Sequence, residues 1–115
     1  MELKAFYVQV GGSYEETISR LMNERIMNKY IRRFPADPTY TQLEDAVAAK
    51  DWETAFRAVH TMKGVAANLG FGRLLAGADA LTEALRGNKP LEDASLLKQV
   101  EDEYAAVIAA IGALD

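Results

Sequence analysis

The fold is decided by residues 51–70, which have the sequence DWETAFRAVHTMKGVAANLG. Asp51 can accept a hydrogen bond from the first turn of a helix, and Gly70 can adopt the left-handed conformation that ends one. Between them, apolar residues recur three or four positions apart, as they do along one side of an amphipathic helix. These residues are Trp52, Ala55, Val59, Met62, Ala66 and Leu69. The pattern therefore predicts a long helix with one side in a protein core.

The opposite side of this helix carries His60, the only histidine in the chain. At about 100° per residue, His60 lies on the arc that points away from the apolar side. Lys63 and Phe56 lie on the shoulder between the two sides. The other residues of the outer arc are Glu53, Arg57, Gly64 and Ala67. The imidazole is therefore predicted to reach solvent.

Gly64 lies one turn after His60 and on the same arc. A glycine in the middle of a helix costs about 1 kcal/mol relative to alanine, so its presence needs an explanation. Close packing of a second helix is one explanation, but the helical wheel directs Gly64 away from the core. We favour the alternative that the missing side chain leaves room beside the imidazole for a bulky group and for the surface of a partner.

Two cationic side chains flank His60. Lys63, three residues later, can bring its ammonium group near an anion attached to the imidazole ring. Because the two groups are expected to be exposed, the gain should be about 1 kcal/mol or less. Arg57, three residues earlier, offers a second positive charge, although a solvated helix face explains it equally well. An imidazole keeps a lone pair near neutral pH, so His60 is a candidate nucleophile.

Hydrophobic spacing and capping residues predict six further helices, three of which are expected to be capped by Ser13, Asn23 and Asp37. Their approximate ranges are 3–10, 13–21, 23–34, 37–50, 74–85 and 91–111. Residues 6–10 could instead form a strand, although no other segment offers them a strand partner. The segments on either side of residues 35–38 form either one kinked arm or two separate helices. We predict an all-α fold, an antiparallel four-helix bundle with additional short N-terminal helices.

Length and composition predict one globular domain spanning residues 1–115. Half of the 115 residues are hydrophobic, 26% are charged, and none is cysteine. The formal net charge of −4 argues against a nucleic-acid partner, because binding to phosphates needs a basic surface. The sequence contains neither a signal peptide nor a transmembrane stretch. We expect a monomeric cytoplasmic protein that does not bind membranes.

Three kinds of enzymatic site lack support in the sequence. No serine has a nucleophile-elbow context. A di-iron bundle uses paired Glu-x-x-His motifs, whereas this chain has a single histidine. No glycine-rich loop or Walker motif is present for ATP. We therefore expect no kinase activity, no cofactor and no metal ion bound by this chain.

The residues from His60 to Gly64, followed after five residues by Gly70, match the pattern H-x-x-K-G-x5-G. This pattern is the signature of histidine-containing phosphotransfer (HPt) domains, and the chain resembles that family. The resemblance is sharpest over residues 51–86, and it extends over most of the chain in the order and length of the helices.

The resemblance implies that His60 carries a phosphoryl group between receiver domains of two-component signalling proteins. It also implies that Lys63 stabilises the group, that Gly64 clears the approach and that Gly70 ends the helix. The expected partners are a response-regulator receiver domain, which would bring its own magnesium ion, and a hybrid histidine kinase.

The same resemblance implies a docking surface around His60. Its candidate residues are Phe56, Arg57, Ala67, Asn68 and Phe71, although Phe56 and Phe71 suit the core equally well. One departure from the family pattern lies shortly after Gly64, where many members have hydroxyl side chains. Ala66, Ala67 and Asn68 stand there instead, which puts a hydroxyl hydrogen bond to the phosphoryl group in doubt.

Two alternatives stay open at this point. A helical-bundle adaptor would bind signalling partners without phosphorylation of His60, and a metal-dependent bundle enzyme would contain bound metal after purification. The sequence also leaves open whether the chain is a freestanding protein or a part of a hybrid kinase, although its start at Met1 and its short length favour the former.

Overall fold

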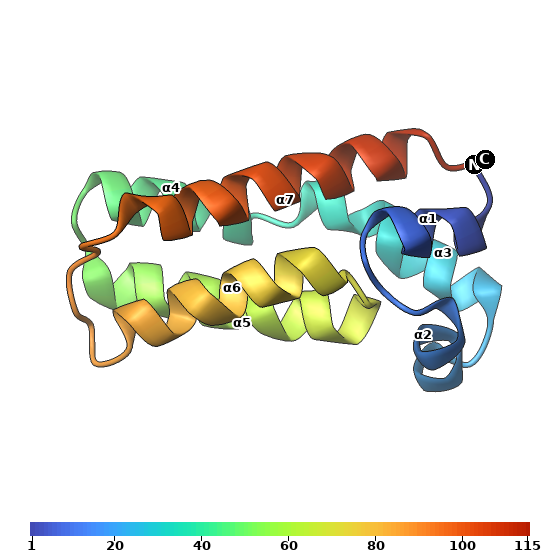
Figure 1. Ribbon diagram of the computed structural model, residues 1–115, viewed down its shortest axis with the longest axis horizontal. Helices are drawn as coiled ribbons and strands as arrows, with labels where there is room; N and C mark the ends of the chain where they lie inside the picture. The colour runs from blue at the N-terminus through green and yellow to red at the C-terminus, as the bar shows by residue number, and fades with distance from the viewer.

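The computed structural model describes all residues from Met1 to Asp115, and its regular secondary structure is entirely helical (Figure 1). The elements in chain order are α1 (Leu3–Gln9), α2 (Tyr14–Leu21), α3 (Glu24–Arg33), the 3₁₀ turn η1 (Phe34–Ala36), α4 (Thr39–Ala48), α5 (Trp52–Leu69), α6 (Gly72–Leu85) and α7 (Ala94–Gly112). The all-α prediction is confirmed, and residues 6–10 lie in and at the end of a helix rather than in a strand.

Short polar side chains begin several of these helices. Ser13 Oγ accepts a hydrogen bond from the Glu16 amide at 3.1 Å, and Asn23 Oδ1 accepts one from the Ile26 amide at 2.9 Å. The carboxylate of Asp51 accepts from both the amide and the hydroxyl of Thr54, which lowers its pKa. The sequence predicted these three caps, because N-cap bonding depends on residues only two or three positions apart.

The helices α4 to α7 form an antiparallel four-helix bundle, and α1 to α3 lie at one end of it (Figure 1). The segment around residues 35–38 makes two helices rather than one kinked helix. After η1 the backbone becomes extended at Asp37, whose side chain then accepts hydrogen bonds from the amide and hydroxyl of Thr39. Because of this local break, α4 begins as a separate helix. It runs alongside α7.

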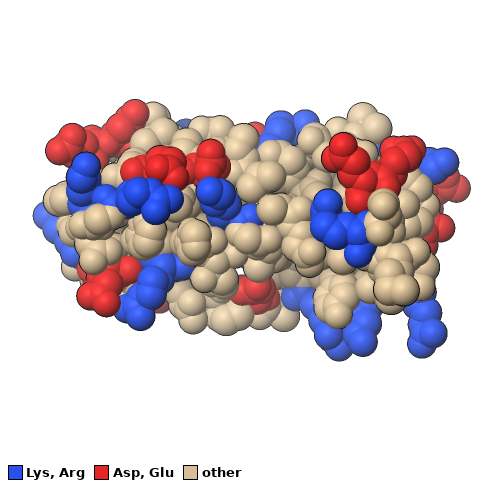
Figure 2. All heavy atoms as spheres, turned by 90° about the horizontal axis from the view of Figure 1, so that it is seen from below, with Lys and Arg blue, Asp and Glu red and all other residues tan.

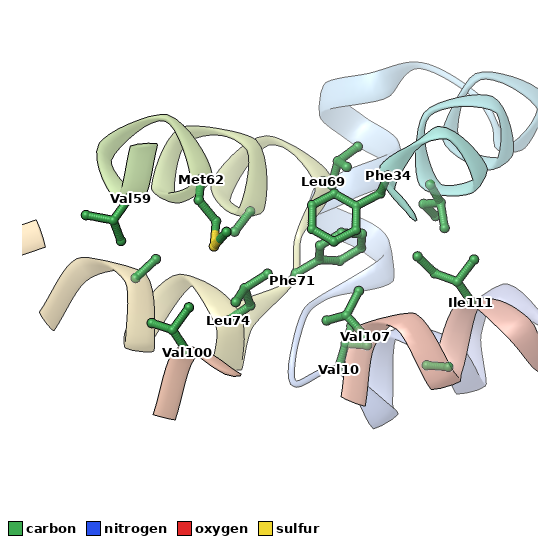
Figure 3. Packing of buried hydrophobic residues seen from close by; sticks show 14 of the residues in the cluster. Val10, Phe34, Val59, Met62, Leu69, Phe71, Leu74, Val100, Val107 and Ile111 are labelled. Carbon is green, nitrogen blue, oxygen red and sulfur yellow. The ribbon is translucent and has the colours of Figure 1, made fainter. Parts of the chain in front are cut away.

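One continuous hydrophobic core runs from α1 to α7. In Figure 3, Val59 and Met62 of α5 point toward Val100 of α7. Farther along, the fully buried ring of Phe71 makes edge contacts with Phe34, whose ring centroid is 5.1 Å away, and with Phe6 of α1 at 5.9 Å. These aromatic contacts join the N-terminal helices to the bundle.

The end of α5 is held by the N-terminal helices. The buried hydroxyl of Tyr7 donates to the Leu69 carbonyl at 2.7 Å, and burial raises the pKa of Tyr7 to about 12. The guanidinium of Arg20 donates to the carbonyls of Ala67 and Asn68 over 2.9 to 3.2 Å. These donors satisfy carbonyls that the last turn of a helix leaves without intrahelical partners. The helix that carries His60 is therefore fixed at its C-terminal end.

The interface between α4 and α7 contains an unfavourable carboxylate, Glu44. Its Oε1 atom is buried without a hydrogen-bond partner. Burial raises the pKa of Glu44, and the nearby carboxylate of Glu101 raises it further. A group whose pKa is raised on folding stabilises the fold while it is protonated, and that stability is lost as the pH rises through the folded-state pKa. At pH 7 the ionised Glu44 should therefore weaken the bundle.

The Glu44→Gln variant is expected to be more stable than the original chain at pH 7, by about 0.5 to 1 kcal/mol, because the glutamine side chain carries no charge to desolvate. The difference should shrink toward pH 4, where Glu44 is protonated in the original chain. Urea denaturation at both pH values measures it. Glu92→Gln, at an exposed position outside the bundle interfaces, is the control. A difference that does not depend on pH, or a loss of stability at pH 7, would contradict this explanation.

Candidate functional site

The imidazole of His60 lies on the exposed face of α5, as the helical wheel predicted. Val59 and Met62, which flank it in sequence, are buried in the core. No hydrogen bond to the His60 side chain is present within the chain. The ring nitrogens are therefore not engaged by internal partners, and the ring is accessible to an approaching molecule.

An aromatic ring supports the imidazole. Phe56, one turn earlier and half-buried, lies nearly parallel to His60, with a centroid distance of 5.8 Å and an interplanar angle of 11°. The guanidinium of Arg86 lies 5.7 Å from the centroid of the Phe56 ring and is paired with Glu83 at 2.8 Å. Stacking of this kind restricts the orientations that the exposed imidazole can adopt.

Gly64 faces open space. A Cβ atom added at this position would meet no heavy atom within 4 Å outside its own helix turn. At Gly77 of α6, by contrast, the same atom would lie 3.4 Å from the side chain of Gln99. The distance at Gly77 is an ordinary van der Waals contact, and Gly64 has no such neighbour at all, so packing gives no reason for Gly64. The surface one turn after His60 is clear of side-chain atoms, as the sequence analysis favoured.

Lys63 forms an ion pair with α6. Its Nζ atom lies 2.8 Å from Oδ1 of Asp79, and the two side chains are 33% and 52% exposed. An ammonium group has three N–H donors, so this pairing leaves donors available for a second anion. The other nearby cation, Arg57, pairs with Glu53 at 3.2 Å, and both side chains are mostly exposed. Arg57 thus has the geometry of a solvated helix face.

The remaining docking candidates differ in position. Ala67 and Asn68 are exposed beyond Gly64 on α5. Phe71, however, is fully buried, so its assignment to the docking surface is wrong. The turn between α5 and α6 directs its ring inward against Phe34 and Phe6, where it closes the junction between the bundle and α1.

A shallow hollow of about 230 Å³ lies beside the C-terminal half of α5. Its lining comes from α3, α5 and the connection that leads to α4, and consists of Tyr30, Arg33, Phe34, Asp37, Val65, Asn68 and Leu69. Asn68 is the docking candidate that lines this hollow, whereas Arg57 and Ala67 each line a different one.

Charge is mixed around the bundle. Figure 2 shows the molecule from the side on which α5 and α6 lie. Basic and acidic side chains are interspersed over the surface of the bundle in this view. No group of three or more His, Cys, Asp or Glu side chains is placed to hold a metal ion. No helix is both long and apolar enough to cross a bilayer.

Comparison with protein-family models matches the Hpt domain over residues 36–110. The chain belongs to the Hpt domain family. The matched span begins in η1 and ends in the last turn of α7, so it contains α4, α5 with His60, α6 and most of α7. Neither the search of curated proteins nor the search of solved structures found a match.

Membership of the Hpt domain family implies histidine-containing phosphotransfer in two-component phosphorelays, in which these domains are carriers rather than enzymes. It also implies interaction with receiver domains and histidine kinases. The exposed His60 on the second helix of the matched bundle agrees with this role.

Sequence reasoning missed the residues of α6 that contact the neighbours of His60, where Asp79 pairs with Lys63 and Arg86 lies over Phe56. Asp79, Glu83 and Arg86 follow His60 by about twenty residues or more, so no short-range spacing connects them to it. They reach the site because α6 turns back along α5 immediately after Gly70. The only available signal was their spacing at i, i+4 and i+7, which places them on one face of a helix.

Proposed function

We propose that His60 of this Hpt domain accepts a phosphoryl group from the phosphorylated aspartate of one receiver domain and donates it to another. The observation that carries the proposal is the exposed imidazole of His60, with open space at Gly64 and the ammonium of Lys63 within the family motif. The position of a Cβ at Gly64 has no neighbouring atom within 4 Å, so this side of the ring offers room for a bulky dianionic group.

In the transfer step, the lone pair of one ring nitrogen of His60 attacks the phosphorus of the aspartyl phosphate. A nitrogen–phosphorus bond forms while the phosphorus–oxygen bond to the aspartate breaks, and the carboxylate leaves with the electron pair. The proton on the other ring nitrogen stays on the ring or passes to water. The reverse reaction transfers the group to a second aspartate.

Two residues of this chain assist the step by their position. Lys63 places positive charge beside the phosphoryl oxygens, and the parallel ring of Phe56 limits rotation of the imidazole. Magnesium belongs to the receiver in this proposal and supplies the neutralising charge on that side. Phe56, Arg57, Ala67 and Asn68 would contact the receiver around His60.

The test is incubation of the purified domain with a receiver domain that carries radiolabelled aspartyl phosphate, with the receiver's magnesium present. The expected result is label on the Hpt domain that is labile in acid and stable in base, as a phosphoramidate is. ATP alone should give no label. Binding of the receiver without any label would instead favour the adaptor, and stoichiometric metal in the purified domain would favour the metal-dependent enzyme.

A substitution at Gly64 distinguishes its effect on the stability of the fold from its effect on access to His60. Gly64→Gln is expected to raise the free energy of unfolding by up to about 1 kcal/mol, because glutamine favours the helix and meets no neighbour. The added side chain should nevertheless slow transfer to His60 at least tenfold by filling the approach. Urea denaturation and the initial rate of labelling measure the two effects.

The control for this variant is Ala105→Gln, which adds a glutamine at an exposed helical position on α7. Its rate of labelling should equal that of the original chain. Unchanged labelling of the Gly64→Gln variant would contradict the role of Gly64 in access.

A further inference from the structure

The ion pair between Lys63 and Asp79 links α5 to α6 beside the histidine. Lys63 Nζ lies 2.8 Å from Asp79 Oδ1, and Lys63 is three residues, or nearly one helical turn, from His60. The next acidic residue along this face of α6, Glu83, is held by Arg86 at 2.8 Å. Asp79 is therefore the acidic residue whose ion-pair partner is the motif lysine.

We propose that Asp79 is a positioning residue that sets how strongly Lys63 stabilises a phosphoryl group on His60. This inference rests on the proposed function. Before transfer, Asp79 holds the ammonium toward α6. After transfer, Lys63 lies between two anions, the Asp79 carboxylate and the phosphoryl group, and its charge is divided between them.

Asp79 should thus make phosphohistidine less favourable in two ways. It competes for the N–H donors of Lys63, and its own negative charge repels the dianionic phosphoryl group. For a carrier this has a useful result, because a group that is bound less tightly is more easily passed on. Asp79 would shift the equilibrium away from phospho-His60 and toward the phosphorylated receiver.

The exposure of the Lys63 and Asp79 side chains determines how strongly Asp79 should affect the transfer equilibrium. Both members of the pair are partly open to water, so each interaction is screened. We expect that removal of the Asp79 charge shifts the equilibrium constant for transfer about threefold toward phospho-His60. The shift should diminish at 1 M salt, where the Debye length falls to about 3 Å.

The experiment compares Asp79→Asn with Asp102→Asn, each measured as the equilibrium ratio of labelled domain to labelled receiver. Asp102 is a matched control because it is also an exposed aspartate paired with a lysine, Lys98, but on α7. Both substitutions remove one negative charge. The expected result is a shift in the Asp79 variant alone, larger at low salt than at high salt.

A double-mutant cycle with Lys63→Gln tests whether Asp79 acts through the lysine. In the Lys63→Gln background, Asp79→Asn should shift the equilibrium by clearly less than threefold. An equal shift in both backgrounds would overturn the positioning role, and so would equal behaviour of the Asp79 and Asp102 variants. Failure of the original chain to take label would refute the proposed function instead, so the two failures are distinguishable.

Discussion

Replacement of His60 by glutamine is expected to abolish phosphoryl uptake and to leave the fold intact. Glutamine is polar and has good helix propensity, but it has no nucleophilic ring nitrogen. His60 is exposed, and its stacking on Phe56 is its closest aromatic contact, so the free energy of unfolding should change by about 0.5 kcal/mol or less. Label from a phosphorylated receiver and urea denaturation of the same preparation measure the two quantities.

The Ala105→Gln variant also serves as the control here, because it contains the same new side chain far along the chain from His60. It should take up label normally. Since His60 is the only histidine, labelling of the His60→Gln variant at the original level would mean that another residue type carries the group, and it would refute the proposed function.

Gly70→Ala is expected to lower the free energy of unfolding by about 2 to 4 kcal/mol. Gly70 has a φ of 78°, where alanine is strained by about 1 to 2 kcal/mol. Its new Cβ would also lie 2.2 Å from Thr17 Oγ1 and 2.9 Å from the Tyr7 ring. Thr17 is buried and donates to the Ser13 carbonyl, so it has little freedom to move away. Urea denaturation followed by circular dichroism gives the value.

The Gly87→Ala variant distinguishes the strain of a positive φ from the steric contact with Thr17 and Tyr7. Gly87 has nearly the same φ, 79°, but a Cβ at this position would meet nothing within 4 Å. Its loss of stability should therefore be about 1 to 2 kcal/mol, from the backbone conformation alone. If both alanine variants lose the same amount, the contact with Thr17 and Tyr7 makes no contribution.

The sequence predicted those features that depend on residues near one another along the chain. The caps at Ser13, Asn23 and Asp51 and the stop at Gly70 each rest on interactions within a few positions. The exposure of His60 followed from helical periodicity. The apolar residues of α5 form one continuous face, and His60 lies on the face opposite to it. The family motif then added the chemistry that periodicity does not contain.

Features that depend on tertiary contacts were harder to predict. Phe71 lies between two glycines in the turn after α5, where no periodicity specifies a direction, and its ring points inward only because α1 and η1 supply Phe6 and Phe34. The pairing of Lys63 with Asp79 likewise depends on the return of α6 along α5. A one-dimensional pattern does not specify which residues meet across two helices.

The anchoring of α5 has a thermodynamic consequence for any visiting protein. Asp51 secures the start of the helix, Tyr7 and Arg20 secure its end, and His60 lies midway in an uninterrupted run of 18 helical residues. The backbone that presents the imidazole has already lost its conformational freedom during folding, so docking does not have to restrict it again. Association can then proceed without an ordering step in this helix, which would suit the relay between two receivers proposed above.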